Sequence, residues 1–187
     1  MTPSTQPSPE PETSEEYFKQ FHQWQGDTTH CADFSISMAC HIYCAKMGKP
    51  AEDCAVGQIT GFLDRFFFMR FRFPNLKGGI MEGGATPCGV IAALHRLGIP
   101  FCFNLFGTLG GLEKALGDGK TIIVSLGKIL DPKAGTWGHV VLVVGETDGV
   151  FLLLDPAIKE NKVSRRDKRA LLNDWWYTPV HPCWVIG

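Results

Sequence analysis

The sequence predicts an α+β fold, with helices in the first part of the chain and an antiparallel sheet in the second. The chain has 187 residues, of which 44% are apolar and 20% are charged, as is usual for a protein with one core. Apolar segments that end at glycine lie within the first 120 residues, as expected of buried helices. Beyond residue 120 the apolar segments are short and rich in β-branched residues, which is typical of strands.

The first residues differ from the rest in composition. Residues 1–14 read MTPSTQPSPEPETS, with four prolines and no basic or aromatic side chain. Such a segment cannot bury an apolar face, so we expect a disordered leader over residues 1–15. A single domain is expected over residues 16–187, beginning with a short amphipathic segment near Tyr17.

The first buried helix is expected over residues 31–47, CADFSISMACHIYCAKM. Gly48 follows directly and a proline comes two residues later, which together form a helix stop signal. Thr28 and Thr29 are candidate N-caps, because a threonine hydroxyl accepts hydrogen bonds from the first amides of a helix. Cys31 is thereby placed in the first turn of a core helix.

Between this helix and residue 120 we expect further helices and loops. Residues 51–76 are expected to be helical and then extended, and residues 78–87 to form a glycine-rich loop. In the extended part Arg70 and Arg72 alternate with apolar residues, and both are expected to face solvent. Two more helices are predicted over residues 88–97 and 110–117.

The second part of the chain is expected to form the antiparallel sheet. Its strands are predicted over residues 121–126, 139–146, 150–155 and 180–186. Thr147-Asp148-Gly149 joins the second strand to the third and is a hairpin signal. The charged run SRRDKR, residues 164–169, is predicted to be a solvated loop or helix face.

The charge balance excludes several classes of partner. Lys plus Arg number 18 and Asp plus Glu 19, so the net charge is −1. This balance gives no electrostatic reason to bind nucleic acid or an anionic membrane. No apolar run reaches the roughly 18 residues that cross a bilayer, and no secretory signal is visible. We therefore expect a cytoplasmic protein with no nucleic-acid partner and no membrane insertion.

The seven cysteines are expected to be reduced thiols, because their number is odd and no signal peptide is visible. The sequence has no Cys-x-x-Cys pair, which argues against a zinc ribbon and a thioredoxin-type redox site. Cys40 and Cys44 lie one helical turn apart, where a metal pair is conceivable but buried core thiols are favoured. No cofactor and no metal ion are expected.

Three polar residues lie at the ends of predicted elements, where packing gains little from them. Cys31 opens the first core helix, His139 begins one strand and Asp155 ends the next. In a hairpin the start of one strand lies beside the end of the following one. We therefore expect His139 and Asp155 to be neighbours at one edge of the sheet.

These residue types suit thiol chemistry. A free thiol has a pKa of about 8.5, and both a helix N-terminus and a nearby imidazole favour its thiolate form. A carboxylate on the other ring nitrogen fixes the tautomer and orientation of the imidazole. The backbone N–H of Cys31 and the side-chain amide of Gln25, six residues earlier, are candidate oxyanion donors.

The stretches QGDTTHC, residues 25–31, and GHVVLVVGETDGVFLLLDP, residues 138–156, resemble the papain-like cysteine peptidases. The resemblance is strongest to the peptidase C39 branch, including its stand-alone members. That branch has Gln six residues before a nucleophile at a helix start, and later Gly-His, an apolar strand, a turn, a strand and Asp-Pro. Residues 110–126 also resemble the helix and strand that precede the histidine there, so the similarity spans most of residues 20–160.

The resemblance implies a papain-like fold in which an N-terminal helical part packs on a C-terminal antiparallel β-sheet. It implies that Cys31 is the nucleophile, His139 the base, Asp155 the orienting carboxylate and Gln25 the oxyanion-hole donor. The family commonly has glycine directly after the nucleophile, whereas this chain has Ala32.

Other residues compete for these roles. Cys88 also opens a predicted helix, but the residue six positions before it is Glu82, whose carboxylate would repel an oxyanion. His181 is a second candidate base, but no carboxylate follows it. Trp137 and Gly138, directly before the favoured base, are expected to line the substrate-binding site. Packing between a strand and a loop is an equal alternative for Trp137.

The residues and the resemblance together predict a cysteine peptidase-like thiol hydrolase acting on a peptide or protein substrate. The reaction would proceed through an acyl-enzyme on Cys31. Two alternatives remain open: acyl transfer from the same thiol to an amine, and a catalytically inactive C39-like domain that binds a peptide. The family's bacteriocin-processing members sit on ABC transporters with membrane spans and an ATPase, and this chain shows neither.

Overall fold

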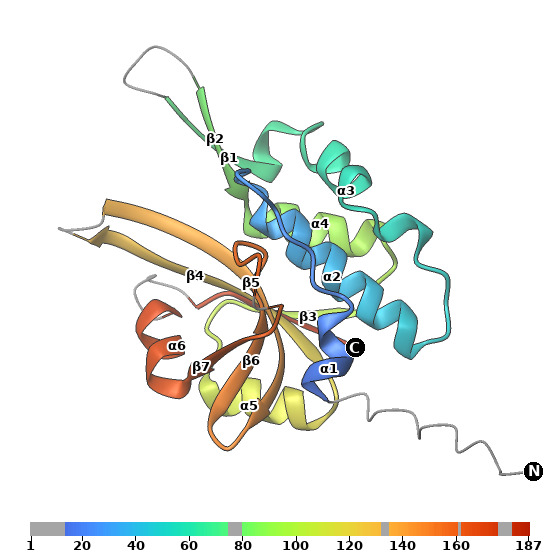
Figure 1. Cartoon of the computed structure of the whole chain (residues 1–187). Helices are drawn as coiled ribbons and strands as arrows, with labels where there is room; N and C mark the ends of the chain where they lie inside the picture. Colours follow the sequence, from blue (N-terminus) through green and yellow to red (C-terminus); the bar gives the residue numbers. More distant parts are fainter. Residues whose placement is uncertain (1–13, 75–79, 132–134, 161, 176–180) are drawn as a thin grey trace, which may run out of the picture.

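The computed structural model describes residues 14–74, 80–131, 135–160, 162–175 and 181–187 (Figure 1). The helices are α1 (Glu15–Lys19), α2 (Cys31–Lys46), α3 (Val56–Leu63), α4 (Pro87–Arg96), α5 (Leu109–Gly117) and α6 (Lys168–Trp175), with the 3-10 helices η1 (Glu52–Cys54) and η2 (Phe67–Met69). The strands are β1 (Arg70–Pro74), β2 (Ile80–Ala85), β3 (Phe101–Asn104), β4 (Thr121–Asp131), β5 (Gly135–Thr147), β6 (Val150–Leu154), β7 (Ser164–Asp167) and β8 (Cys183–Ile186). None of the helices in these ranges has the length and apolar character that a membrane crossing requires.

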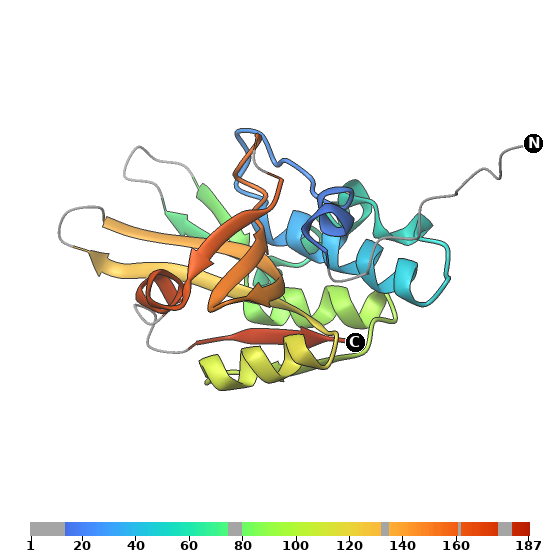
Figure 2. The same ribbon diagram turned by 60° about the horizontal axis from the view of Figure 1, so that its bottom comes forward.

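A six-stranded sheet of order β3-β8-β4-β5-β6-β7 separates two helical layers (Figures 1 and 2). All its strand pairs are antiparallel, which confirms the predicted α+β class. Helices α2, α3 and α4 share one apolar core with one face of the sheet, while α5 and α6 share a second core with the other face. Alternate residues of β4 and β5 enter opposite cores, as strand geometry requires.

Helix α2 is the central helix of the first core, and it is buried along most of its length. It ends where the sequence predicts, because Gly48 adopts φ +61 and the amide of Lys49 returns to the carbonyl of Cys44 at 2.9 Å. The start differs from the expectation of a threonine cap. His30 occupies the N-cap position, and its side chain makes no capping hydrogen bond.

The predicted hairpin of β5 and β6 is confirmed. Leu142 pairs with Leu154, and the strands turn at Asp148 and Gly149, which have φ values of 53 and 80. Two consecutive residues with positive φ are typical of a type I′ turn, whose twist matches that of the strands. β5 begins at Gly135, four residues before His139, because β4 and β5 continue together as a long hairpin (Figure 1).

Several expectations for the loops are wrong. Part of the predicted glycine-rich loop, residues 78–87, is β2, which pairs with β1 in a separate two-stranded sheet. The run at residues 164–169 forms the edge strand β7 and the first residues of α6. Each strand forms by pairing with the strand before it in the chain, β2 with β1 and β7 with β6, and residue composition alone does not report such pairing. Residues 1–13 lie outside the described part of the chain, so the leader stays a prediction.

The expectation that every cysteine is reduced is also wrong. Cys40 of α2 and Cys54 of η1 form a disulfide, with their Cα atoms 5.6 Å apart. The two residues are only 14 positions apart in sequence, and the chain turns back after α2, so η1 packs against the helix it has just left. A pairing that depends on this reversal is not visible in cysteine spacing alone.

Candidate active site

Cys31 is the first residue of α2, and its side chain lies at the junction between that helix and the sheet. The residue is 6% exposed, and its thiol is free. The 16-residue helix directs its N-terminal amides toward this end, where they favour a negative charge. The sulfur of Cys31 is therefore placed at the positive end of the helix dipole.

The strands bring His139 and Asp155 together. Nε2 of His139 lies 2.6 Å from Oδ1 of Asp155, and both side chains are largely buried. Asp155 directly follows β6, and His139 lies on the neighbouring strand β5, so the antiparallel pairing makes them neighbours. The same Oδ1 also accepts a hydrogen bond from the backbone N–H of Ala157 at 3.0 Å. The carboxylate is thus held in place on two sides.

Cys31 completes this hydrogen-bonded chain. Its side chain interacts with the ring of His139 through a hydrogen bond and through charge. Burial by itself would lower the pKa of His139, but the hydrogen bonds and charges of Asp155 and Cys31 outweigh it and raise the pKa to about 9. The arrangement favours a protonated imidazole between two groups that can carry negative charge.

The carboxylate responds in the opposite direction. Burial by itself would raise the pKa of Asp155, but the hydrogen bond and charge of His139 outweigh it and hold the pKa below its usual range. The amide of Ala157 and the charge of Arg166 act in the same sense. Asp155 is therefore ionised at neutral pH and orients the imidazole.

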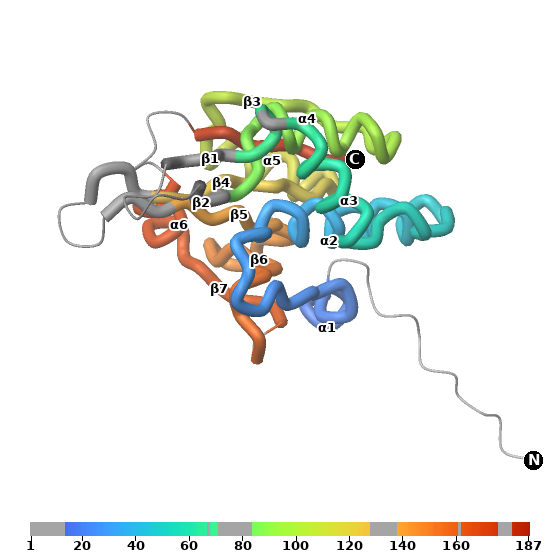
Figure 3. The backbone as a smooth tube through the Cα atoms, turned by 90° about the horizontal axis from the view of Figure 1, so that it is seen from above, coloured from blue at the N-terminus to red at the C-terminus, as the bar shows by residue number. Residues whose placement is uncertain are grey.

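The segment between α1 and α2 is attached to the same corner of the sheet (Figure 3). The amide of Gln25 donates to the carbonyl of Pro156 at 2.9 Å, next to the orienting carboxylate. The side-chain Nε2 of Gln25 donates to the carbonyl of Thr28 at 2.9 Å, and Thr28 Oγ1 returns a bond to Gln25 O. Oε1 of Gln25 is buried without a hydrogen-bond partner in the described ranges. The side-chain amide of Gln25 is thus fixed in a tight turn directly before α2.

His22 contributes a contact that sequence reasoning missed. Its Nε2 donates to the backbone carbonyl of Asp155 at 2.9 Å. The bond spans 133 positions of sequence, so no local pattern could have indicated it. His22 thereby ties the N-terminal segment to the residue that orients the imidazole.

A buried ion pair lies in the first turn of α2, close to Cys31. Asp33, two residues after Cys31, has no exposed surface and accepts hydrogen bonds from both terminal nitrogens of Arg70, at 2.6 and 3.2 Å. Its Oδ2 also accepts from Thr60 Oγ1 at 2.7 Å, and it lies 3.1 Å from Nδ1 of His30. The guanidinium of Arg70 additionally binds Asp64.

This network corrects the expectation that Arg70 faces solvent, since the residue is only 3% exposed. Alternation along the strand predicts the opposite face, but a carboxylate within the core attracts the guanidinium inward. The side chain of Arg72 lies outside the described part of the chain, so its exposure stays a prediction. The ion pair connects the start of α2 to α3 and to the two-stranded sheet.

Gly84 of β2 lies against Cys31. A Cβ atom at this position would sit 3.9 Å from Cys31 Sγ and 3.8 Å from the carbonyl oxygen of Thr29. Glycine at this position therefore adds no side-chain atom next to the sulfur. Sequence reasoning missed this neighbour because it treated the surrounding residues as a loop.

Gly138, Trp137 and Cys88 are the other residues that the sequence marks as candidates for the site. Gly138 is an exposed residue of β5 paired with Gly127, and the side chain of Trp137 lies outside the described part, so their substrate-binding role stays a prediction. Cys88 is an exposed thiol in the first turn of α4. The thiol that His139 contacts within the described chain is that of Cys31, not that of Cys88.

Comparison with known proteins shows which fold carries this site. No protein-family model matches the sequence, and no curated protein is significantly similar to it. A solved structure from Bacillus anthracis, assigned as a C39-like peptidase, superposes with a TM-score of 0.61 at 12% identity, covering 90% of this chain and 95% of that one. The peptidase domain of Streptococcus ComA, a bifunctional ABC transporter involved in quorum sensing, superposes with a TM-score of 0.53 at 16% identity. That match covers 88% of this chain and 96% of the ComA domain. The chain therefore has the papain-like fold of the C39 peptidase domains, with Cys31, His139 and Asp155 together at one edge of its sheet.

Proposed function

We propose that this chain is a cysteine-dependent hydrolase, a peptidase that cleaves peptide or amide bonds through an acyl-enzyme on Cys31. The observation that carries the proposal is the hydrogen-bonded chain of Cys31, His139 and Asp155. Each member has the environment that its role needs: a thiol at a helix N-terminus, an imidazole with a raised pKa and an ionised carboxylate. The fold shared with C39 peptidase domains supports the same reaction class.

Acylation uses the sulfur and the ring in turn. The thiolate of Cys31 adds to the carbonyl carbon of the substrate, and the carbonyl oxygen takes the negative charge. The backbone N–H of Cys31 and the side-chain amide of Gln25 are the proposed donors to that oxygen. His139 then gives its Nδ1 proton to the amine nitrogen, the C–N bond breaks, and a thioester remains on the sulfur.

Deacylation restores the starting state. Nδ1 of His139 accepts a proton from water while the water oxygen attacks the thioester carbonyl. The C–S bond breaks, the acid leaves, and the thiolate again faces a protonated imidazole. Asp155 keeps the ring oriented through both steps and stabilises the imidazolium.

Alkylation of the native chain tests the activated thiol. Iodoacetamide is added near neutral pH, and mass spectrometry reads the modification of each cysteine with time. Cys31 is expected to react much faster than Cys183, another buried free thiol, and His139→Ala should slow Cys31 alone. A rate at Cys31 no higher than that at Cys183, and unchanged by His139→Ala, would contradict the proposal.

Turnover is tested with a peptide library and identification of the products. Cys31→Ala should abolish cleavage while the circular dichroism spectrum stays native, and Cys88→Ala should retain cleavage. Products in which an added amine replaces water would indicate acyl transfer. Peptide binding by both wild type and Cys31→Ser without any cleavage would instead support a binding domain and refute the hydrolase.

A further inference from the structure

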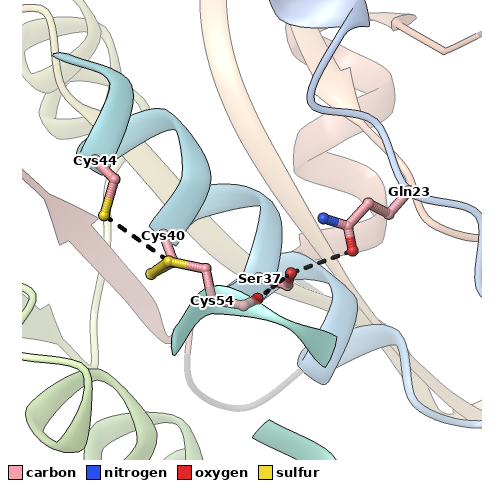
Figure 4. The surroundings of a disulfide bond; sticks show 5 residues. All are labelled: Gln23, Ser37, Cys40, Cys44 and Cys54. Atoms are coloured by element: carbon pink, nitrogen blue, oxygen red, sulfur yellow. Dashed lines mark hydrogen bonds between the residues drawn. A yellow bond between two sulfur atoms is a disulfide. The ribbon is translucent and has the colours of Figure 1, made fainter. Parts of the chain in front are cut away.

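Three cysteine sulfurs converge on the far half of α2, away from the proposed active site. Cys40 and Cys44 lie one turn apart on α2, Cys54 lies on η1, and all three sulfurs are within 4.8 Å of one another (Figure 4). Cys40 and Cys54 form the disulfide, while Cys44 keeps a free thiol. Its Sγ lies 3.8 Å from that of Cys54. The proposed peptidase mechanism uses none of these residues.

We propose that Cys44 makes this cluster an internal thiol–disulfide exchange site. The thiolate of Cys44 attacks Sγ of Cys54 and forms a Cys44–Cys54 bond. The Cys40–Cys54 bond breaks, and its electron pair leaves with the sulfur of Cys40, which takes up the proton that Cys44 gave up. The number of disulfides and thiols is unchanged, so the step needs neither an oxidant nor a reductant.

The helix geometry permits either pairing. Residues four apart on a helix lie on the same face, so Cys40 and Cys44 both point toward η1. The backbone of Cys54 is held independently of its sulfur, because Ser37 Oγ donates to its carbonyl at 2.6 Å. Cys54 thus stays beside α2 while its sulfur changes partner. Exchange moves the crosslink by one helical turn.

Cys44 is the most exposed residue of the cluster, so we expect a small thiol to react there first. Cys40 and Cys54 are each 2% exposed, whereas Cys44 is 8% exposed. After exchange the disulfide includes Cys44, the most exposed residue of the three, and we expect a small thiol to reduce it there more readily. Cys44 therefore controls how fast the crosslink between α2 and η1 is opened.

Two of the other described thiols, Cys31 and Cys183, stand apart from this site. Cys31 is nine residues away at the other end of α2, which is about 13 Å along the helix axis. Cys183 belongs to the core on the opposite face of the sheet. Cys183→Ser is therefore a matched control that removes a buried thiol without touching the cluster.

Disulfide mapping of Cys40→Ser tests the exchange partner. The full-length variant is reoxidised with oxidised glutathione, quenched in acid and digested without reduction for mass spectrometry. We expect a Cys44–Cys54 disulfide in Cys40→Ser, and the original Cys40–Cys54 disulfide in both Cys44→Ser and Cys183→Ser. A natively folded Cys40→Ser chain in which Cys44 and Cys54 both stay reduced would overturn the proposal.

A kinetic comparison keeps the proposal testable if Cys40→Ser does not fold. Cys44→Ser retains the native disulfide, and reduced glutathione is added to it, to wild type and to Cys183→Ser. We expect the crosslink of Cys44→Ser to open several-fold more slowly than that of wild type, with Cys183→Ser matching wild type. Equal rates in wild type and Cys44→Ser would overturn the role of Cys44 as the entry point.

Discussion

The imidazole of His139 donates a hydrogen bond of 2.6 Å from Nε2 to Oδ1 of Asp155, an oxygen that also accepts the backbone N–H of Ala157. The amide of Ala157 thus holds the same carboxylate oxygen that binds the ring of His139. Together with the thiol, this carboxylate raises the pKa of His139 to about 9.

The first prediction concerns the pH dependence of stability. His139 has a higher pKa in the folded chain than in the unfolded one, so its contribution is complete below pH 6.5 and is lost as pH rises through about 9. Asp155→Asn removes the charge that supports this shift, and should lower the free energy of unfolding by about 2 kcal/mol at pH 6. The difference from wild type should shrink toward pH 10 in urea titrations.

Asp118→Asn, at an exposed position, is the control and should follow wild type at every pH. A destabilisation by Asp155→Asn that is independent of pH would show that the carboxylate acts through packing alone. The pKa of His139 would then need another cause.

The second prediction concerns the buried ion pair. Arg70→Ala leaves the carboxylate of Asp33 buried and without its main charged partner, which should cost about 3–5 kcal/mol of unfolding free energy. Arg165→Ala removes an exposed ion pair to Glu15 and should cost less than about 1 kcal/mol. Chemical denaturation of the two variants compares them directly. Equal costs would mean that the buried pair adds no more than the surface pair.

The third prediction concerns Gly84. In Gly84→Ala the new methyl group lies at ordinary van der Waals distance from its nearest neighbours, 3.8 Å from the carbonyl oxygen of Thr29 and 3.9 Å from Cys31 Sγ, so the fold should be kept. The methyl lies next to the sulfur, so alkylation of Cys31 and peptide cleavage should both slow several-fold. Gly61→Ala, whose Cβ meets no atom within 4 Å, should leave both rates unchanged. An unaltered rate in Gly84→Ala would place the approach to the sulfur on another side.

The fourth prediction concerns the Cys40–Cys54 disulfide, which closes a loop of 14 residues in sequence separation. Removing it with Cys54→Ala should lower the free energy of unfolding by about 3 kcal/mol, chiefly because the unfolded chain regains freedom. Cys88→Ala, at an exposed free thiol, should have little effect. If the wild-type chain, kept oxidised, is no more stable than Cys54→Ala, the disulfide does not stabilise this fold.

The parts of the fold that the sequence predicted correctly are those whose signals are local. The helix at Cys31, the hairpin turn at Asp148-Gly149 and the apolar strands on either side of it depend on stop signals, turn residues and hydrophobic runs. Their order along the chain also indicated that His139 and Asp155 would meet, because two antiparallel strands leave little freedom in where their ends lie. The proximity of Cys31 to this pair was predicted from the family resemblance alone, because α2 and β5 lie far apart in the sequence.

The residue pattern therefore indicates the chemical groups and the elements that carry them. The packing of the folded chain brings Arg70 inward to Asp33, His22 to Asp155, Gly84 to the sulfur of Cys31 and Cys54 to Cys40. Each of these contacts joins segments that are brought together by packing rather than by neighbouring sequence. A charge or a thiol finds its partner only after the core has chosen which faces meet, and that choice depends on the apolar surface of the whole chain.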